Sequence, residues 1–228
     1  MLIVLEGLDG AGKSTQVRML KEYLKERCGE LEYIHFPRYE APVYGDLISR
    51  FLRGEFGDNS QVHPQLVALL FAEDRHGAVP EMRAALEGGK PVLLDRYVYS
   101  NIAYQCAKLK DLKERRNLRN WIFHTEYGEF GLPEPDLNLF LDVPIGFVEQ
   151  SLTKGRSGSD REYLEGGSRD IHEADMAFQR AVRDAYLQEA ARDPHFLRVD
   201  CSAPDGSMLP PEAIFNLVRE TVDPILAK

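Results

Sequence analysis

The first fifteen residues constrain this chain most strongly. Residues 2–5 form an unbroken apolar run, which is typical of a strand buried in a parallel sheet. The pattern G-x-x-x-x-G-K-S follows from Gly7 to Ser14, and a helical pattern begins directly after it. Glycines let backbone N–H groups turn inward around a polyphosphate, and the helix N-terminus adds partial positive charge. This stretch therefore predicts a nucleotide phosphate-binding loop rather than an ordinary glycine-rich turn.

Two side chains of this loop have expected roles of their own. Lys13 is expected to reach the terminal phosphates of the nucleotide, and the Ser14 hydroxyl is expected to ligate Mg²⁺. We expect the Lys13 side chain to face solvent when no nucleotide is bound. The residues predicted to bind the donor nucleotide are Gly7, Gly10, Ala11, Gly12, Lys13, Ser14 and Thr15.

The rest of the chain alternates short apolar strands with helical patterns. Strands are predicted at residues 2–5, 31–36, 92–95, 137–143 and 196–199. Helices are predicted after Lys13 and at residues 45–53, 64–86 with a break at Pro80, 100–110, 111–126, 145–154, 170–192 and 213–226. The alternation predicts an α/β fold of the P-loop NTPase type, a three-layer sandwich with a five-stranded parallel sheet and helices on both faces.

No linker or repeat divides the chain, so residues 1–228 are predicted to form a single P-loop kinase domain. Residues 155–168 are rich in glycine, serine and charged side chains, and we expect them to form a mobile lid. Within this lid, Arg156 and Arg161 are candidates for stabilising the charge that develops when a phosphoryl group is transferred. The alternative interpretation is a solvated charged loop.

Composition limits the partners that this chain can have. The net charge of −9 argues against general nucleic-acid binding, although a few local arginines can still form a nucleotide pocket. No apolar run is long enough for a membrane span, and Glu6 and Asp9 interrupt the apolar start, so no signal peptide is expected. The three cysteines lie far apart and are typical of a protein in a reducing cytoplasm. None of the six histidines has metal-pair spacing, so each is interpreted as structural.

Charged residues follow three of the predicted strands, at the edge where parallel sheets carry their sites. Asp9 lies in the phosphate loop, Arg38 follows the second strand, and Asp95 and Arg96 follow the third. Asp95 is predicted to hold Mg²⁺ opposite Ser14, the alternatives being a helix N-cap or an ion pair with Arg96. Arg38 and Arg96 are predicted to clamp a second phosphate group, because the guanidinium fork suits bidentate phosphate contact. Either arginine alone would be interpreted as a surface residue.

Four segments together resemble the thymidylate kinases. Residues 6–16, EGLDGAGKSTQ, look like the phosphate loop of that family, and residues 70–75, LFAEDR, look like its base-recognition helix. Residues 95–105, DRYVYSNIAYQ, look like a second signature, and residues 135–144 resemble the strand that follows it. The lid region and residues 170–173 are also similar. Glycine at position 10 resembles the family members that carry the catalytic arginine in the lid.

The resemblance implies a role for each matching position. Phe71 would stack on thymine and Arg75 would hydrogen-bond its edge, although the residue types alone favour a core Phe71 and an exposed Arg75. Arg38 and Arg96 would hold the acceptor 5′-phosphate, Asp9 would meet the sugar 3′-hydroxyl, and Tyr104 would crowd the 2′ position. Ser100 and Gln105 would lie near the base. The residues predicted to act in catalysis are Lys13, Asp9, Arg96, Arg156 and Arg161.

These observations predict an enzyme that phosphorylates a deoxynucleoside monophosphate with ATP and Mg²⁺, converting dTMP to dTDP. The resemblance also implies a homodimer. A kinase of another nucleotide or of a nucleoside stays open as an alternative, although a nucleoside kinase would not need two arginines for an acceptor phosphate. A regulatory nucleotide switch is a second alternative. A GTP-binding switch needs an N/T-K-x-D segment, and the nearest match, residues 153–156, lacks the aspartate.

Overall fold

A computed structural model of the chain describes residues 1–154, 164, 170–173 and 175–226. Within these residues, five strands form one parallel sheet in the order β2-β3-β1-β4-β5. The strands are β1 (Leu2–Gly7), β2 (Glu32–His35), β3 (Val92–Asp95), β4 (Leu137–Asp142) and β5 (Phe196–Asp200). The three central strands β1, β3 and β4 are buried along their whole length. Their largely apolar sequences agree with this burial, because helices cover a parallel sheet on both faces.

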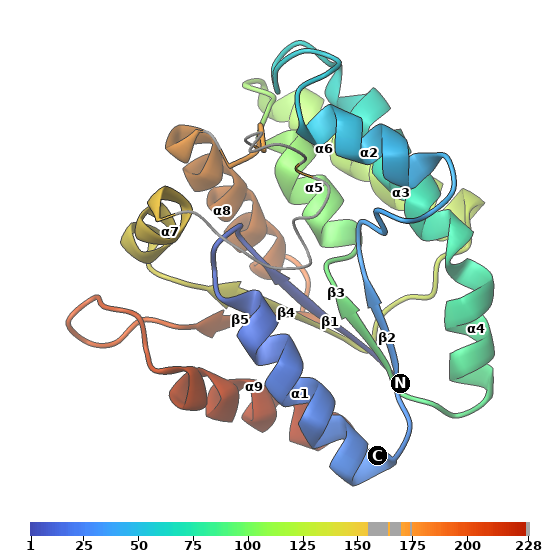
Figure 1. The fold of residues 1–228 in the computed structure, drawn as a ribbon, viewed down its shortest axis with the longest axis vertical. Helices are drawn as coiled ribbons and strands as arrows, with labels where there is room; N and C mark the ends of the chain where they lie inside the picture. The colour runs from blue at the N-terminus through green and yellow to red at the C-terminus, as the bar shows by residue number, and fades with distance from the viewer. Residues whose placement is uncertain (155–163, 165–169, 174, 227–228) are drawn as a thin grey trace.

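Two layers of helices enclose the sheet (Figure 1). Helices α1 (Lys13–Cys28) and α9 (Pro211–Leu226) pack together on one face. Helices α5 (Val98–Cys106) and α8 (Met176–Ala190) pack together on the other face, where α3 (Pro64–Gly77) and α6 (Leu112–Phe123) lie outside α5. The remaining α-helices of the described residues are α2 (Tyr44–Leu52), α4 (Val79–Glu87) and α7 (Ile145–Thr153). The fold class predicted from the sequence is thereby confirmed.

Strand register brings the loops after β1 and β3 to the same height. Leu5 of β1 lies opposite Asp95, the last residue of β3, and the Arg96 backbone N–H donates to the Leu5 carbonyl over 2.9 Å. The phosphate loop and the segment that begins at Arg96 therefore leave the sheet side by side. This placement makes the carboxyl edge of the central strands the natural position for a site.

The helix predicted at residues 170–192 begins later than expected, at Met176. Asp175 caps it, because its side chain accepts a hydrogen bond from the Ala177 N–H over 2.8 Å. Asp170 holds a separate turn by accepting from the His172 N–H over 2.7 Å. Aspartate side chains that accept hydrogen bonds from nearby backbone N–H groups favour turns and helix starts. The helix therefore begins later than side-chain periodicity alone predicts.

The helix predicted at residues 111–126 changes its geometry near its end. It begins as α6, with Asp111 as its N-terminal cap, and continues as a π-helix, η1 (His124–Glu129). A π-helical turn is rare and is often associated with functional sites. Here it carries Glu126, which is fully buried against α3 and α5. Throughout the described residues, each helix is too short or too polar to cross a membrane.

Candidate active site

The phosphate loop joins β1 to α1 through two glycines in the left-handed region. Gly10 has a φ of 75° and Gly12 a φ of 73°, which L-residues with side chains rarely adopt. Gly12 also caps α1, and within the described residues no side chain accepts a hydrogen bond at this helix start. The Thr15 N–H donates to the Gly12 carbonyl over 3.2 Å, and the other N–H groups at this helix start suit an anion. A Cβ atom at Gly10 would lie 3.0 Å from the Ser151 hydroxyl of α7, so this position also needs a small residue for packing.

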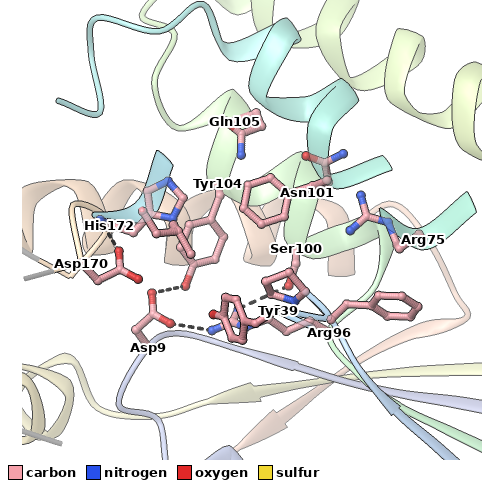
Figure 2. Close-up of a pocket in the computed structure, with 14 residues that line it drawn as sticks. Asp9, Tyr39, Arg75, Arg96, Ser100, Asn101, Tyr104, Gln105, Asp170 and His172 are labelled. Atoms are coloured by element: carbon pink, nitrogen blue, oxygen red, sulfur yellow. Dashed lines mark hydrogen bonds and ion pairs between the residues drawn. The ribbon is translucent and has the colours of Figure 1, made fainter. Parts of the chain in front are cut away.

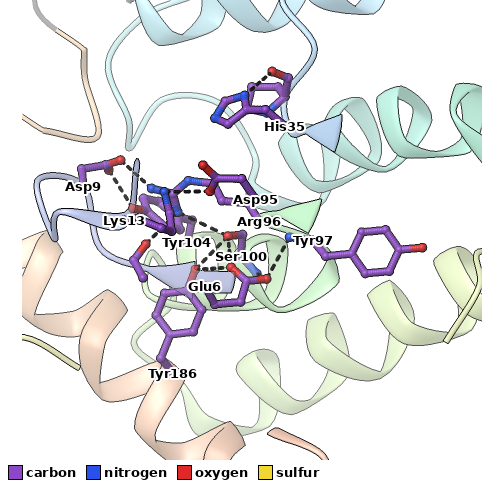
Figure 3. Close-up of polar contacts among 12 residues, drawn as sticks. Glu6, Asp9, Lys13, His35, Asp95, Arg96, Tyr97, Ser100, Tyr104 and Tyr186 are labelled. Carbon is purple, nitrogen blue, oxygen red and sulfur yellow. Dashed lines mark hydrogen bonds and ion pairs between the residues drawn. The ribbon is translucent and has the colours of Figure 1, made fainter. Parts of the chain in front are cut away.

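The Lys13 side chain does not face solvent, and the expectation that it would is wrong. Its Nζ lies 2.9 Å from Asp95 Oδ1, and both residues are buried. Burial lowers the pKa of Lys13 and the Arg96 charge lowers it further, whereas Asp95 opposes both. Burial would raise the pKa of Asp95, but Lys13, His35 and Arg96 hold it below its usual range. Because β1 and β3 are neighbours, Lys13 folds back onto the carboxylate at the end of β3 (Figure 3).

Arg38 is held by α3 instead of projecting freely. Its backbone N–H donates to Asp74 Oδ2 over 2.9 Å, its Nε donates to Oδ1 over 3.0 Å, and its guanidinium also contacts the Asp74 carbonyl. Among the described residues, Arg38 lines an open hollow together with Ser14 and Asp95. The predicted metal ligands and one predicted phosphate-binding arginine thus face the same space.

A pocket lies beside the phosphate loop (Figure 2). Aromatic rings and a few polar side chains share its walls, a combination that is usual in small-molecule sites. Apart from Arg38, every residue predicted to bind the acceptor lines it, namely Asp9, Phe71, Arg75, Arg96, Ser100, Tyr104 and Gln105. Pro37 and Tyr39 line both this pocket and the hollow with Arg38, so the two spaces adjoin.

Arg96 connects the pocket to the phosphate loop. Its Nη2 lies 2.7 Å from Asp9 Oδ1, and its Nη1 donates to the Gly7 carbonyl over 2.9 Å. The Arg96 backbone has a φ of 68°, an uncommon value for a residue other than glycine. The Tyr104 hydroxyl donates to the other Asp9 oxygen over 2.7 Å. Uncommon backbone conformations such as that of Arg96 cluster at functional sites.

Arg75 is buried, and the interpretation of it as exposed is wrong. It forms two hydrogen bonds to the Glu126 carboxylate, over 2.5 and 2.8 Å, and the same carboxylate accepts from Asn101 over 2.8 Å. The sequence pattern around Arg75 does not reveal this arrangement, because Glu126 lies 51 positions away on the π-helix. Phe71 is half-buried on the pocket wall and packs edge-on against Phe51, with ring centroids 6.5 Å apart.

Two residues of the pocket wall carry a buried polar atom that lacks a hydrogen-bond partner among the described residues. The Oε1 atom of Gln105 and the Oδ1 atom of Asn101 are buried and accept no hydrogen bond within the part of the chain that the structure describes. Both residues line the pocket. A buried acceptor without a donor is unfavourable by about 1–3 kcal/mol, so these atoms suit a ligand that donates to them.

The structure adds pocket residues that sequence reasoning misses. Tyr39, Asn101, Asp170 and His172 all line the pocket. Asn101 directly follows Ser100 in the second signature, and this place in the motif is a signal that could have found it. The interpretation of His172 as structural is incomplete, because the side chain also forms part of the pocket wall. Its place in residues 170–173, which resemble the same family, is the sequence signal that could have found it.

The predicted lid falls almost entirely outside the described residues. Of residues 155–168, the structure describes Leu164 alone. Arg156 and Arg161, the two predicted lid arginines, therefore lie outside the described residues, and their roles stay predictions from the sequence.

Sheet order and loop together define a class of protein. A parallel sheet with the G-x-x-x-x-G-K-S loop between its central strand and α1 is the arrangement of a P-loop NTPase fold. Comparison with known proteins gives the particular family. The family model described as thymidylate kinase matches residues 5–207.

Individual relatives agree with this match. A thymidylate kinase of Mycobacterium tuberculosis (strain H37Rv) is 36% identical over 193 residues, covering 84% of this chain and 86% of the relative. A probable thymidylate kinase of Thermococcus kodakarensis is 33% identical over 235 residues, covering 100% of both chains. The solved structure of a thymidylate kinase from Candida albicans has a TM-score of 0.70 at 29% identity and covers 98% of this chain and 91% of that chain.

The chain belongs to the thymidylate kinase family, whose members phosphorylate dTMP to dTDP with ATP. It is accordingly an enzyme, and the predictions of family, fold class and reaction are confirmed. The alternative of a regulatory switch has no support from these comparisons.

The buried pair of Arg75 and Glu126 allows a test of stability. Replacing Glu126→Gln removes the negative charge and leaves the Arg75 guanidinium buried without a charged partner. We expect the free energy of unfolding, measured by urea denaturation, to fall by about 3 kcal/mol. Glu129→Gln is the matched control, because Glu129 is exposed on the same π-helix and should change stability by no more than about 0.5 kcal/mol. Equal losses for the two variants would contradict this description of the pair.

Proposed function

We propose that the chain transfers the phosphoryl group between two adjoining parts of one site, a donor part at the phosphate loop and an acceptor part in the pocket. The ion pair between Asp9 and Arg96, with atoms 2.7 Å apart, carries this proposal. Asp9 belongs to the loop, and Arg96 lines the pocket. A nucleotide on each side would have its reacting phosphates close to this pair, which supplies the proximity that catalysis requires.

In the donor part, ATP phosphates would be held by the loop backbone and Lys13. Lys13 would exchange Asp95 for a phosphate oxygen, which would leave the Asp95 carboxylate free for another cation. The residues proposed to bind ATP are Gly7, Gly10, Ala11, Gly12, Lys13, Ser14 and Thr15.

Ser14 and Asp95 would hold Mg²⁺ in this part of the site. Both line the same hollow, and hydroxyl and carboxylate oxygens are the donors that Mg²⁺ prefers. Among the described residues, no group of three acidic, histidine or cysteine side chains gathers to hold a metal. This agrees with a cation that takes only one or two protein ligands and completes its shell with water and substrate phosphates. Bound Mg²⁺ would neutralise phosphate charge.

In the acceptor part, Arg38 and Arg96 would hold the 5′-phosphate of dTMP, and Asp9 would meet the 3′-hydroxyl. Tyr104 would crowd the 2′ position from its place beside Asp9. Arg38 lines the adjoining hollow. Its guanidinium would reach the phosphate from that side.

The thymine base would lie at the other end of the pocket. Phe71 would stack on its face, whereas Arg75, Ser100 and Gln105 would contact its edge. An aromatic face accepts any base, so discrimination has to come from polar groups at the edge. The partnerless Oε1 of Gln105 within the described part of the chain supports this assignment, because the thymine N–H is a donor.

Transfer of the phosphoryl group leaves little covalent chemistry for the protein to perform. Lys13 and the lid arginines Arg156 and Arg161 would stabilise charge on the transferred group, and Arg96 would align the acceptor oxygen. The two lid roles rest on the sequence alone. Closure of such a lid over both substrates would exclude water and so prevent ATP hydrolysis.

We also propose that residues 1–228 act as one domain, that the chain forms a homodimer, and that it works in the cytoplasm. One apolar core joins the sheet to both helix layers, and the three cysteines are free thiols. Leu66 of α3 and Leu112 of α6 are 63% and 70% exposed on neighbouring helices, so a second copy that covered both helices would bury apolar surface there. We expect a single unfolding transition and a mass in solution of twice 25.9 kDa. Two transitions, or a monomer mass by light scattering, would contradict the respective proposals.

A panel of acceptors tests the proposed function. With ATP and Mg²⁺, we expect dTMP to be phosphorylated faster than other nucleoside monophosphates, and thymidine not to be phosphorylated. A chelator should stop turnover and added Mg²⁺ should restore it. Lys13→Ala should lower turnover by about 100-fold or more, with circular dichroism showing that the variant is folded. Phosphorylation of thymidine but not of dTMP would contradict the proposal.

Arg96→Ala tests the acceptor clamp. Removing a guanidinium that binds a phosphate should weaken binding by about 2 kcal/mol, which corresponds to a rise in the KM for dTMP of about 30-fold. The KM for ATP should change by less than about threefold, on the same scale. Arg18→Ala is a suitable control, because Arg18 is exposed on α1 and pairs with Glu22 at 3.7 Å. Similar rises in both KM values would contradict the assignment.

A further inference from the structure

Glu6 is a charged residue in the interior of the sheet. It lies near the end of β1, directly before the phosphate loop, and none of its surface is exposed. A carboxylate in such a position is costly unless several hydrogen bonds compensate for the lost water. The simplest interpretation is a core residue that only stabilises the fold. The contacts of Glu6 decide between this role and a role at the site.

Four donors converge on the Glu6 carboxylate (Figure 3). Its Oε1 accepts from the backbone N–H groups of Tyr97 and Ser100, over 2.9 and 3.1 Å. Its Oε2 accepts from the Tyr186 hydroxyl over 3.0 Å and from the Ser100 hydroxyl. Burial raises the pKa of Glu6, whereas Ser100, the Arg96 charge, Tyr97 and Tyr186 favour its ionised form.

Three of these donors, two of them backbone N–H groups, belong to the start of α5. The N-cap residue Tyr97 makes no side-chain capping bond, so Glu6 satisfies N–H groups of this helix from a different element. A negative charge at a helix N-terminus is favourable. Arg96 is the residue directly before the cap, with its φ of 68°. The bond from Tyr97 to Glu6 therefore fixes the peptide that follows Arg96.

The Ser100 hydroxyl connects Glu6 to the Arg96 side chain. This hydroxyl has one hydrogen, which it donates to Glu6, and its oxygen lies 3.3 Å from the Arg96 Nη1 that donates to it. The Tyr186 hydroxyl lies 2.8 Å from the same oxygen. Glu6 thus sets the orientation of the hydroxyl that Arg96 contacts, and its charge attracts the guanidinium.

We infer that Glu6 is a positioning residue, which holds Arg96 in the conformation that binds the acceptor phosphate. Glu6 itself lies behind the pocket wall and touches no substrate. The inference rests on the proposed function, because it takes Arg96 as the acceptor clamp. A purely structural Glu6 would affect both substrates alike. A positioning Glu6 predicts instead that its loss weakens acceptor binding selectively.

A double-mutant cycle between Glu6→Gln and Arg96→Ala tests this inference. Glutamine keeps the size of the side chain but removes the charge and one acceptor oxygen. We expect Glu6→Gln to raise the KM for dTMP by about tenfold and the KM for ATP by less than about twofold. In the Arg96→Ala background, the same substitution should change the KM for dTMP by less than about twofold, because the group through which Glu6 acts is gone.

Glu189→Gln is the matched control for this cycle. Glu189 is also buried and pairs with Arg119 and Arg192, away from the pocket, so its substitution should leave both KM values unchanged. If Glu6→Gln fails to fold, Tyr186→Phe takes its place. That variant keeps the ring stacked on Phe140 and removes one of the four donors, so the KM for dTMP should rise by about threefold and the KM for ATP should stay the same.

The outcomes separate the two hypotheses. If Arg96→Ala raises the KM for dTMP selectively but Glu6→Gln or Tyr186→Phe affects both substrates equally, the positioning role is wrong and the proposed function stands. An additive effect of Glu6→Gln in the Arg96→Ala background would also overturn the positioning role. If Arg96→Ala itself shows no selectivity for dTMP, the acceptor clamp of the proposed function is wrong, and the inference fails with it.

Discussion

The ion pair between Asp9 and Arg96 is the contact on which the arrangement of this site depends. It joins the loop after β1 to the segment after β3, which the register of the two strands has already brought to the same height. A displacement of the strands by one residue would move one loop by about 3.3 Å along the sheet, which is more than this contact of 2.7 Å tolerates. The pair is mostly buried, so its geometry is held by the sheet beneath it and by the donors around Arg96.

A second consequence of the register concerns Asp95. The strand that ends in this carboxylate lies next to the strand that ends in the phosphate loop, and Lys13 bridges the two at 2.9 Å. The charged residues Glu6, Lys13, Asp95 and Arg96 thus form a buried layer of polar contacts at the carboxyl end of β1 and β3. Such a layer is stable only when its members satisfy one another, and this makes each of them sensitive to substitution.

Much of the fold and part of the site could be predicted from the sequence. The strands and the phosphate loop are local patterns, so residues 2–15 sufficed to place that loop. The positions of Asp9 and Arg96 followed from motifs near strand ends, and that of Tyr104 from the resemblance of residues 95–105 to the family. The burial of Arg75 could not be predicted, because its partner Glu126 is distant in sequence and is turned inward by a π-helix that periodicity does not reveal. The buried position of Lys13 depends on a contact between neighbouring strands, which the sequence of the loop does not contain.

Each of the four described cations assigned to the site already has an anion of the protein beside it. Lys13 has Asp95, Arg38 has Asp74, Arg75 has Glu126 and Arg96 has Asp9. Phosphate binding at Lys13, Arg38 or Arg96 would therefore be an exchange of anions at a fixed set of cations, rather than the neutralisation of free positive charge. In a chain of net charge −9, such an exchange lets the site hold polyanions without presenting a positive surface that would attract nucleic acid.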